Sequence, residues 1–261
     1  MTTAILLTGG TGTLGRLLLP HLREAGRPVR VLTRRRPAEQ APGVEYALGD
    51  LATNDNVERA VDGAATIVHC AGSAKGDDVK AANLLQAAVR AGAEHVVYIS
   101  VVGADRVPVR SAMDRMAFGY FAAKRAAEVL VAESGIPWTT LRASQFHELT
   151  LTTVRQLARM PVVPVPAGVR FQPVDGAEVA ARLAELALGE PAGLVPDLAG
   201  PRAYGFDELV RSYLRAAGRR RPVVRMPMGG GAYRAIREGA NLAPDRAVGR
   251  RTWEEFLQAN V

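Results

Sequence analysis

Short apolar runs alternate with amphipathic stretches through the first half of the chain. The runs have the length of buried β-strands, and the stretches between them repeat apolar residues every three or four positions, as a helix with one buried face does. The predicted strands are Thr3–Thr8, Val29–Thr33, Val44–Leu48, Thr66–His69, Val96–Ser100 and Trp138–Arg142, and the clearest helices are Asp77–Gly92 and Ala112–Ser134. Because right-handed crossovers join such strands, this order predicts a mostly parallel sheet covered on both faces.

The pattern is less regular beyond Ser144. It predicts helices over Asp175–Leu188 and Phe206–Ala217, a strand over Leu194–Ala199 and an irregular segment from Pro161 to Pro166. No Gly/Ser-rich linker or internal repeat divides the chain. The sequence therefore predicts an α/β fold, with a single Rossmann-type domain and a doubly wound parallel sheet over residues 1–261. We expect insertions at about 146–174 and 201–261 to form a small C-terminal region that covers the substrate side.

Composition places the chain among ordinary globular proteins, since 48% of its residues are hydrophobic and 23% are charged. The single cysteine, Cys70, excludes an intramolecular disulfide and favours a reducing compartment. No apolar run approaches the roughly 20 residues of a membrane span, and no signal peptide is recognisable. We therefore expect a cytoplasmic protein without a membrane partner, whose oligomeric state the sequence leaves open.

The net charge of +7 raises the question of a nucleic-acid partner. Apart from Arg34–Arg36 and Arg219–Arg221, however, the basic residues are scattered along the chain, and only 5% of residues are aromatic. A nucleic-acid-binding protein gathers its basic residues on one face or interleaves them with aromatic residues. The charge pattern therefore argues against nucleic acid and leaves a small-molecule substrate as the expected partner.

A glycine-rich turn joins the first predicted strand to a first helix, whose apolar residues recur at helical spacing from Leu14 to Ala25. Gly9, Gly12 and Gly15 follow a pattern in which the first glycine allows a tight turn, the second lets a pyrophosphate approach, and the third lets helix pack on sheet. Thr11, Thr13 and Leu14 complete the turn and the helix N-terminus, whose free N–H groups attract an anion. Its position between strand and helix indicates a dinucleotide-binding site, the alternative being a tight strand-to-helix turn without a ligand.

The end of the second strand indicates which dinucleotide is bound. An acidic residue there would bind the ribose 2′-OH of NAD, whereas an arginine accommodates the 2′-phosphate of NADP. The sequence continues as Arg34–Arg36, with no acid before Glu39. The missing carboxylate favours NADP over NAD, with Arg34 as the main contact.

Three further segments complete a family resemblance. They are Gly49-Asp50-Leu51, Cys70-Ala71-Gly72 and Tyr120-Phe121-Ala122-Ala123-Lys124. With the glycine turn, they make the chain resemble an atypical short-chain dehydrogenase/reductase of the NmrA-like, NAD(P)H-binding group, which includes proteins similar to nucleoside-diphosphate-sugar epimerases. The resemblance implies that Asp50, with Leu51 beside it, contacts the adenine, and that the backbone of Cys70, Ala71 and Gly72 lines the adenosine ribose. It also implies that Tyr120 and Lys124 carry proton transfer and hold the nicotinamide ribose.

Physical chemistry supports the pairing of Tyr120 with Lys124. Residues four apart lie on one face of a helix, and a nearby ammonium stabilises a phenolate, drawing its pKa down from about 10. Tyr120 could then exchange a proton with a carbonyl oxygen during hydride transfer. The alternative is an amphipathic helix whose tyrosine packs and whose lysine is solvated.

The third catalytic residue of the family is a serine or threonine after the fifth strand. In this chain either Ser100 or Val101 occupies the position, and the choice decides which face the side chain takes. Ser100 could instead bond local backbone. After the sixth strand, Gln145, Phe146 and His147 are candidate substrate contacts. The four histidines lack metal-ligand spacing, so no metal is expected.

The leading hypothesis is an NADP(H)-dependent oxidoreductase that transfers hydride to or from a small carbonyl or quinone-like substrate. The first alternative is a catalytically silent NADP(H)-binding redox sensor that regulates a partner protein. The second is an epimerase or dehydratase acting on a nucleotide sugar, for which the short C-terminal region leaves little room.

Overall fold

The computed structural model describes residues 4–72 and 76–261, and the chain divides into two compact units. The first unit comprises Met1–Ser100, Ala123–Leu141 and Val179–Val195, and the second comprises Val101–Ala122, Arg142–Glu178 and Pro196–Val261. The second unit thus includes both segments that were predicted as insertions, together with Val101–Ala122, which the sequence analysis did not assign to it. Thr3, the predicted start of the first strand, lies outside the described residues.

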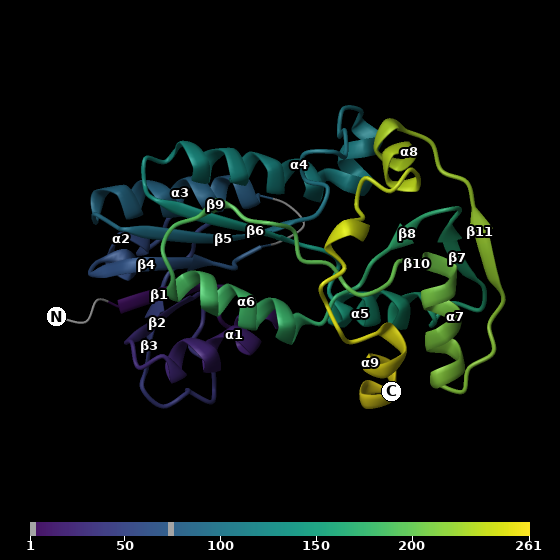
Figure 1. Ribbon diagram of the computed structural model, residues 1–261, viewed down its shortest axis with the longest axis horizontal. Helices are drawn as coiled ribbons and strands as arrows, with labels where there is room; N and C mark the ends of the chain where they lie inside the picture. The colour runs from purple at the N-terminus through teal and green to yellow at the C-terminus, as the bar shows by residue number, and fades with distance from the viewer. Residues whose placement is uncertain (1–3, 73–75) are drawn as a thin grey trace. The chain divides into compact units, whose positions relative to one another are not determined.

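The first unit is built on a seven-stranded sheet with the order β3-β2-β1-β4-β5-β6-β9 (Figure 1). Its strands are β1 (Ala4–Thr8), β2 (Val29–Thr33), β3 (Val44–Leu48), β4 (Ala64–His69), β5 (His95–Val101), β6 (Trp138–Ala143) and β9 (Gly193–Leu194). The described pairings of β1 with β2 and β4 are parallel, as are those of β3, β5 and β9 with their neighbours. The order reverses at β1, so the predicted doubly wound fold is confirmed.

Helices cover both faces of this sheet. In Figure 1, α3 (Asp77–Arg90) and α4 (Ala112–Glu133) lie along one face, and α1 (Thr13–Glu24) and α6 (Gly176–Leu188) lie along the other. Two covered faces explain why the strands are continuous apolar runs. A short helix, α2 (Val57–Val61), was not predicted. No helix in the described part of the chain is both long enough and apolar enough to cross a membrane.

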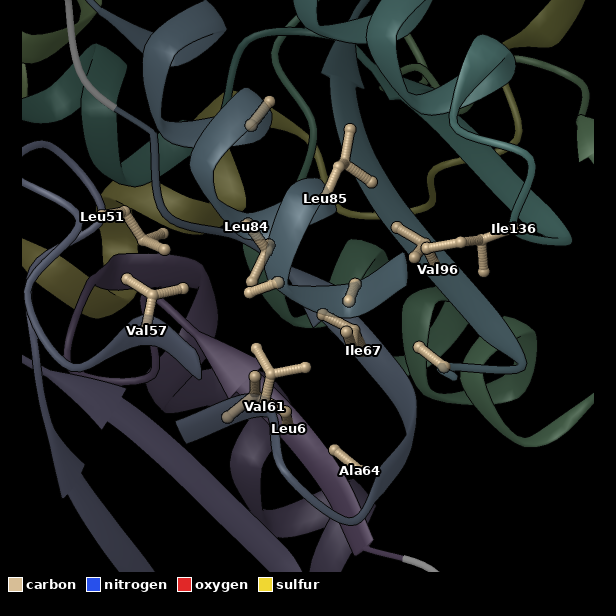
Figure 2. Packing of buried hydrophobic residues seen from close by; sticks show 14 of the residues in the cluster. Leu6, Leu51, Val57, Val61, Ala64, Ile67, Leu84, Leu85, Val96 and Ile136 are labelled. Carbon is tan, nitrogen blue, oxygen red and sulfur yellow. The ribbon is translucent and has the colours of Figure 1, made fainter. Parts of the chain in front are cut away.

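The core of the first unit lies between the sheet and α3. Leu6, Ile67 and Val96 come from neighbouring strands and pack with Leu84 and Leu85 of α3 (Figure 2). The three strand residues have no exposed surface. Burial of each such side chain contributes about 1.5–3 kcal/mol, so this cluster fixes the strands that end at the candidate site.

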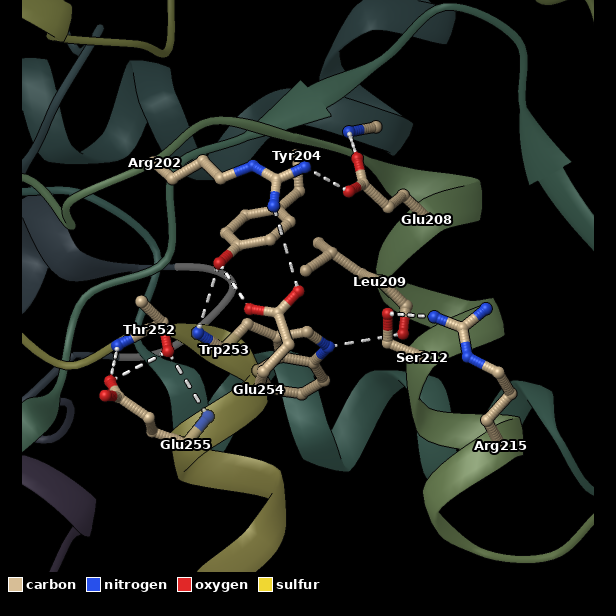
Figure 3. Close-up of polar contacts among 11 residues, drawn as sticks. Arg202, Tyr204, Glu208, Leu209, Ser212, Arg215, Thr252, Trp253, Glu254 and Glu255 are labelled. Atoms are coloured by element: carbon tan, nitrogen blue, oxygen red, sulfur yellow. Dashed lines mark hydrogen bonds and ion pairs between the residues drawn. The ribbon is translucent and has the colours of Figure 1, made fainter.

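The second unit is built from short elements around an aromatic core. Its elements are α5 (His147–Leu157), β7 (Val163–Pro166), β8 (Arg170–Phe171), β10 (Tyr204–Gly205), α7 (Phe206–Ala216), β11 (Val223–Met226), α8 (Gly231–Arg237), the 3₁₀ helix η1 (Pro244–Arg246) and α9 (Trp253–Asn260). Figure 3 shows the indole N–H of Trp253 donating to the Leu209 carbonyl at 3.3 Å and the Tyr204 hydroxyl donating to Glu254 at 2.7 Å. These bonds satisfy buried polar groups and join α9 to α7 and β10.

Two segments differ from the sequence prediction. Pro161–Pro166 was predicted to be irregular, yet Val163–Pro166 forms β7, which pairs in parallel with β11. The N–H groups of Val163 and Ala167 donate to β11 and its flank, so the two intervening prolines fall at alternate positions whose nitrogens face away from the partner. The predicted strand Leu194–Ala199 is shorter than expected, because only Gly193–Leu194 is regular and Pro196 interrupts the ladder.

Candidate cofactor and active site

The glycine turn after β1 is closed by a hydrogen bond from the Gly12 N–H to the Gly9 carbonyl at 2.9 Å. Gly9 has φ +72°, and a Cβ there would lie 2.7 Å from backbone atoms of Cys70 and Ala71. A Cβ on Gly15 would overlap the Gly9 carbonyl oxygen. The turn therefore requires glycine at both positions, because the loop after β4 and the start of α1 press against it.

The start of α1 can accept an anion. Its N-cap, Gly12, has no side chain to bond the first N–H groups, and the first turn contains no acidic residue. Thr11, Gly12 and Thr13 are exposed, and the N–H groups of the first helical turn point out along the helix axis. This cradle fits the pyrophosphate of a dinucleotide.

Arg34 and Asp50 lie just after the ends of β2 and β3. β2 pairs with β1 and ends at Thr33, so Arg34 stands at the same edge of the sheet as the glycine turn and is exposed. Asp50 follows β3, and its Oδ1 accepts the N–H of Ala52 at 2.8 Å, while Leu51 is buried. The sheet thus brings Arg34 and Asp50 to the edge where the adenosine side of a dinucleotide would lie.

The loop after β4 is tied to β1 through a buried threonine. The Thr8 hydroxyl lies 2.7 Å from Nδ1 of His69 and accepts the N–H of Ala71 at 3.3 Å. Burial, aided by the nearby Lys124 ammonium, lowers the pKa of His69 to about 3, so its imidazole is neutral. Burial raises the pKa of the Cys70 thiol to about 12, so this thiol is a poor nucleophile.

Lys124 of α4 is buried, with 4% of its surface exposed. Its Nζ lies 3.3 Å from Oδ2 of Asp77, donates to the Ile99 carbonyl at 3.1 Å and stands 4.9 Å from the ring centroid of Tyr98. Burial by itself lowers the pKa of Lys124, but the Tyr98 and Asp77 side chains outweigh it and raise the pKa above its ordinary value. The ammonium is therefore charged at physiological pH.

Gly72 packs directly against this ammonium. A Cβ at Gly72 would lie 3.2 Å from Nζ of Lys124 and 3.3 Å from Oδ2 of Asp77, and Gly72 itself is exposed. The loop after β4, where the resemblance places the cofactor, therefore runs directly over the Lys124 ammonium.

Ser100 and Tyr120 complete the predicted catalytic set. Ser100 is buried at the end of β5, and its hydroxyl has no hydrogen-bond partner among the described residues. Because side chains alternate along a strand, Ser100 shares a face with Tyr98, whose ring contacts Lys124. Val101 takes the opposite face. Tyr120 lies one helical turn before Lys124 on α4 and is 37% exposed.

The predicted substrate residues lie in the second unit. Gln145 and Phe146 are half-buried, and a bridge between Phe146 and Val174 fixes their backbone. The ring of His147 has no exposed surface and packs 4.9 Å from the ring centroid of Phe256. It therefore belongs to the aromatic core, and we do not include it among the proposed substrate contacts.

Two residues of the site were missed from the sequence. Asp77 begins a helix next to a second acid, Asp78, and an acid in a first helical turn ordinarily indicates only a favourable interaction with the helix dipole. Tyr98 was assigned to a buried strand and given no other role. No local signal could have paired either residue with Lys124, because the contact is made across three elements.

Elsewhere, a pocket of about 460 Å³ in the second unit is lined by Arg211, Leu214, Arg215, Arg219–Arg221 and Pro222. Several of its arginines lie near the C-terminus of α7, where the helix dipole favours cations. In the described part of the chain, no group of three or more histidine, cysteine or acidic residues could hold a metal ion.

The doubly wound sheet and its glycine turn define a Rossmann-type dinucleotide-binding protein. The family described as NAD(P)H-binding matches residues 9–185, and the chain belongs to this family. The (4-alkanoyl-5-oxo-2,5-dihydrofuran-3-yl)methyl phosphate reductase of Streptomyces griseus is 32% identical over 222 residues, which cover 82% of this chain and 74% of that protein.

Two solved structures share the fold. The NADPH-dependent quinone oxidoreductase of Escherichia coli, complexed with NADPH, superposes with a TM-score of 0.80 at 20% identity, covering 98% of this chain and 99% of that chain. The triphenylmethane reductase of Citrobacter sp., complexed with NADP(H), gives a TM-score of 0.74 at 22% identity with the same coverage. The predicted membership of an NAD(P)H-binding family and the predicted NAD(P)H cofactor class are confirmed.

Proposed function

We propose that the protein is an NADPH-dependent reductase of a small carbonyl or quinone-like substrate. The observation that carries the proposal is the charged Lys124 ammonium, buried beneath the exposed Gly72, in the same unit as a glycine turn shaped for a pyrophosphate. The relatives support the reaction class, since the Streptomyces griseus protein is named as a reductase and the Escherichia coli protein as a quinone oxidoreductase.

The cofactor would be held by residues of the first unit. The N–H groups of Thr11, Gly12, Thr13, Leu14 and Gly15 would bind its pyrophosphate, and Arg34 its 2′-phosphate. Asp50 and Leu51 would bound the adenine, the backbone from Cys70 to Gly72 would line the adenosine ribose, and Lys124 would hold the nicotinamide ribose. When bound, the nicotinamide supplies a hydride.

We assign to Tyr120 the donation of the proton that the substrate needs in addition to the hydride. Its phenol would donate to the carbonyl oxygen of the substrate, and the ammonium of Lys124, four residues later on α4, would stabilise the phenolate that remains. The hydroxyl of Ser100, which has no other partner among the described residues, would donate to the same carbonyl oxygen. Gln145 and Phe146 would contact the rest of the substrate.

Replacement of the phenol tests the catalytic assignment. Tyr120→Phe should lower kcat for NADPH oxidation with a panel of quinones and carbonyls by about 10²–10⁴-fold, because the proton donor is lost. The dissociation constant of NADPH, measured by fluorescence titration, should change less than about twofold, since the glycine turn is intact. The matched control is Tyr46→Phe, which removes the hydroxyl of a tyrosine on β3 and should keep native turnover. Native turnover by Tyr120→Phe would remove the assignment.

The same assay separates the alternatives. Tight NADPH binding with no turnover on any substrate would indicate a redox sensor. Conversion of a nucleotide sugar without net oxidation of NADPH would indicate an epimerase or dehydratase. Either result would contradict the proposed reductase.

Selectivity for NADPH over NADH tests the role of Arg34. Arg34→Ala should weaken NADPH binding by about 10–100-fold and leave NADH binding unchanged, because a charge-assisted contact to the 2′-phosphate is lost. Arg36→Ala, in the same exposed run, is the control. Equal losses for both coenzymes would refute the assignment.

A further inference from the structure

The buried carboxylate beside Lys124 has no part in the proposed chemistry. Asp77 is the first residue of α3 and is 1% exposed. Its Oδ2 lies 3.3 Å from Nζ of Lys124, and its Oδ1 lies 3.5 Å from Nζ of Lys80. Burying an ion pair costs more desolvation free energy than most pairs recover, so a purely structural role would be served as well by apolar residues.

We propose that Asp77 is the positioning residue for Lys124, holding the ammonium beneath Gly72 and compensating its charge where cofactor and phenol require it. The inference rests on the proposed function for the role of the ammonium. The pairing itself rests on the structure of the first unit.

The geometry restrains the ammonium from several sides. Asp77 approaches from α3, the Ile99 carbonyl and the Tyr98 ring approach from β5, and the lysine stem comes from α4. An ammonium has three hydrogens to donate, so contacts from separate elements leave it little freedom to move. Gly72 closes over the pair from the loop after β4, since a Cβ there would lie 3.2 Å from Nζ and 3.3 Å from Oδ2.

Asp77 supplies the carboxylate at ion-pair distance from Lys124, and it acts together with the Tyr98 side chain to raise the Lys124 pKa. The other charged and titratable groups around Lys124 are Lys80 on α3, His69 and Cys70 at the end of β4, and Glu128 on α4. Lys80 is a second cation, and His69 and Cys70 are neutral at physiological pH. Glu128 pairs with Arg125 at 3.0 Å. Removal of the Asp77 charge would therefore leave a buried ammonium without the carboxylate at ion-pair distance.

A positioning role and a merely structural one predict different pH profiles. In Asp77→Asn, burial is no longer opposed by the carboxylate, so the pKa of Lys124 should fall and the ammonium should lose its proton as pH rises. Turnover should then decline toward alkaline pH and recover toward neutral or mildly acidic pH. A structural defect would lower turnover at every pH.

The chain has three lysines, Lys75, Lys80 and Lys124, so lysine labelled with ¹³C and ¹⁵N should give three resolvable sets of NMR signals. In the native protein we expect the Lys124 pKa to lie above the ordinary value of a lysine, whereas in Asp77→Asn it should be clearly lower. Asp78→Asn, in the same helical turn, is the control and should titrate like the native protein. An unchanged Lys124 pKa in folded Asp77→Asn would overturn the proposal.

Turnover gives the second readout. Asp77→Glu keeps the charge but displaces it by a methylene, so we expect a native Lys124 pKa with kcat reduced by about tenfold or more. This variant also serves if Asp77→Asn does not fold, and native kcat in Asp77→Glu would contradict the positioning role. If Tyr120→Phe retained full turnover while Asp77→Asn still lowered the Lys124 pKa, the proposed reductase mechanism would fail and the Asp77–Lys124 pairing would stand.

Discussion

A buried amide in the second unit and two buried polar groups in the first unit differ in how far their hydrogen bonds are satisfied. In the second unit, the buried amide of Gln172 donates to the Gly200 carbonyl at 2.8 Å and the Ala243 carbonyl at 3.3 Å, and accepts the Ala243 N–H at 3.0 Å. In the first unit, the buried Ser100 hydroxyl and Nε2 of His69 have no partner among the described residues. A satisfied network holds loops together, whereas an unsatisfied polar atom at a sheet edge is available to a ligand.

The largest predicted contrast concerns two glycines with positive φ. Gly9→Ala in the first unit should raise the dissociation constant of NADPH by at least about 100-fold, because a Cβ would press on the loop after β4 in addition to straining the backbone. Gly218 in the second unit has φ +63°, and a Cβ there would have no atom within 4 Å. Gly218→Ala should therefore cost only about 1 kcal/mol of unfolding free energy. Calorimetric titration and urea unfolding measure the two effects; equal NADPH binding by both variants would break the contrast.

Replacement of Gln172 should have the opposite effects to replacement of Gly9, because it should lower the unfolding free energy and leave NADPH binding unchanged. Gln172→Ala leaves three buried backbone groups without their partner, and we expect a loss of about 3 kcal/mol of unfolding free energy. The dissociation constant of NADPH at 25 °C should not change, provided that the variant is folded. A loss below about 0.5 kcal/mol in urea unfolding would show that this network does not hold the second unit together.

Acid should destabilise both units through their buried histidines. Burial lowers the pKa of His69 to about 3 and that of His147 to about 4, below the value of about 6.5 in an unfolded chain. Each histidine therefore contributes stability that is complete above pH 6.5 and is lost as pH falls toward its folded pKa. The loss is about 1.4 kcal/mol per pH unit for each histidine, or about 2 kcal/mol between pH 6.5 and 5.

Urea unfolding at pH 7 and pH 5 measures this loss. His69→Gln and His147→Leu should each remove about half of the pH dependence that the histidines cause. If both variants kept the full native dependence, the histidines would not be the groups responsible.

The smallest predicted effect belongs to Ser100. Because its hydroxyl has no partner among the described residues, Ser100→Ala should change the unfolding free energy by less than about 0.5 kcal/mol. Turnover should nevertheless fall by about tenfold, since a hydrogen bond to the substrate carbonyl is lost. Thr140→Val, which removes another buried hydroxyl without a described partner, should leave turnover native. Native turnover by Ser100→Ala would end its catalytic role.

The parts that were predictable from sequence are those that local chemistry decides. The glycine turn is recognisable because two requirements arise within the turn itself, the φ of +72° at Gly9 and the close approach of Gly15 to the Gly9 carbonyl oxygen. The strands of the first unit are recognisable because helices on both faces make them continuously apolar. The roles of Tyr120, Lys124 and Ser100 remain predictions, although the structure does place Ser100 on the face that Tyr98 shares.

The parts that were not predictable depend on partners distant in the chain. Asp77 and Asp78 have the same local signal, and only the fold brings one of them to Lys124. The strand at Val163–Pro166 was missed because prolines ordinarily argue against a strand, and its partner lies some sixty residues later at Val223–Met226. Sequence periodicity identifies neither pairing.

The prolines of β7 also affect how the protein behaves at high concentration. β11 pairs with one edge of β7. The nitrogens of Pro164 and Pro166 face the opposite edge of β7, and neither nitrogen carries a hydrogen. A strand from a second molecule would meet an edge without donors at those positions and could not extend the sheet in register. The same residues that obscured the strand in the sequence thus protect it from intermolecular β-aggregation.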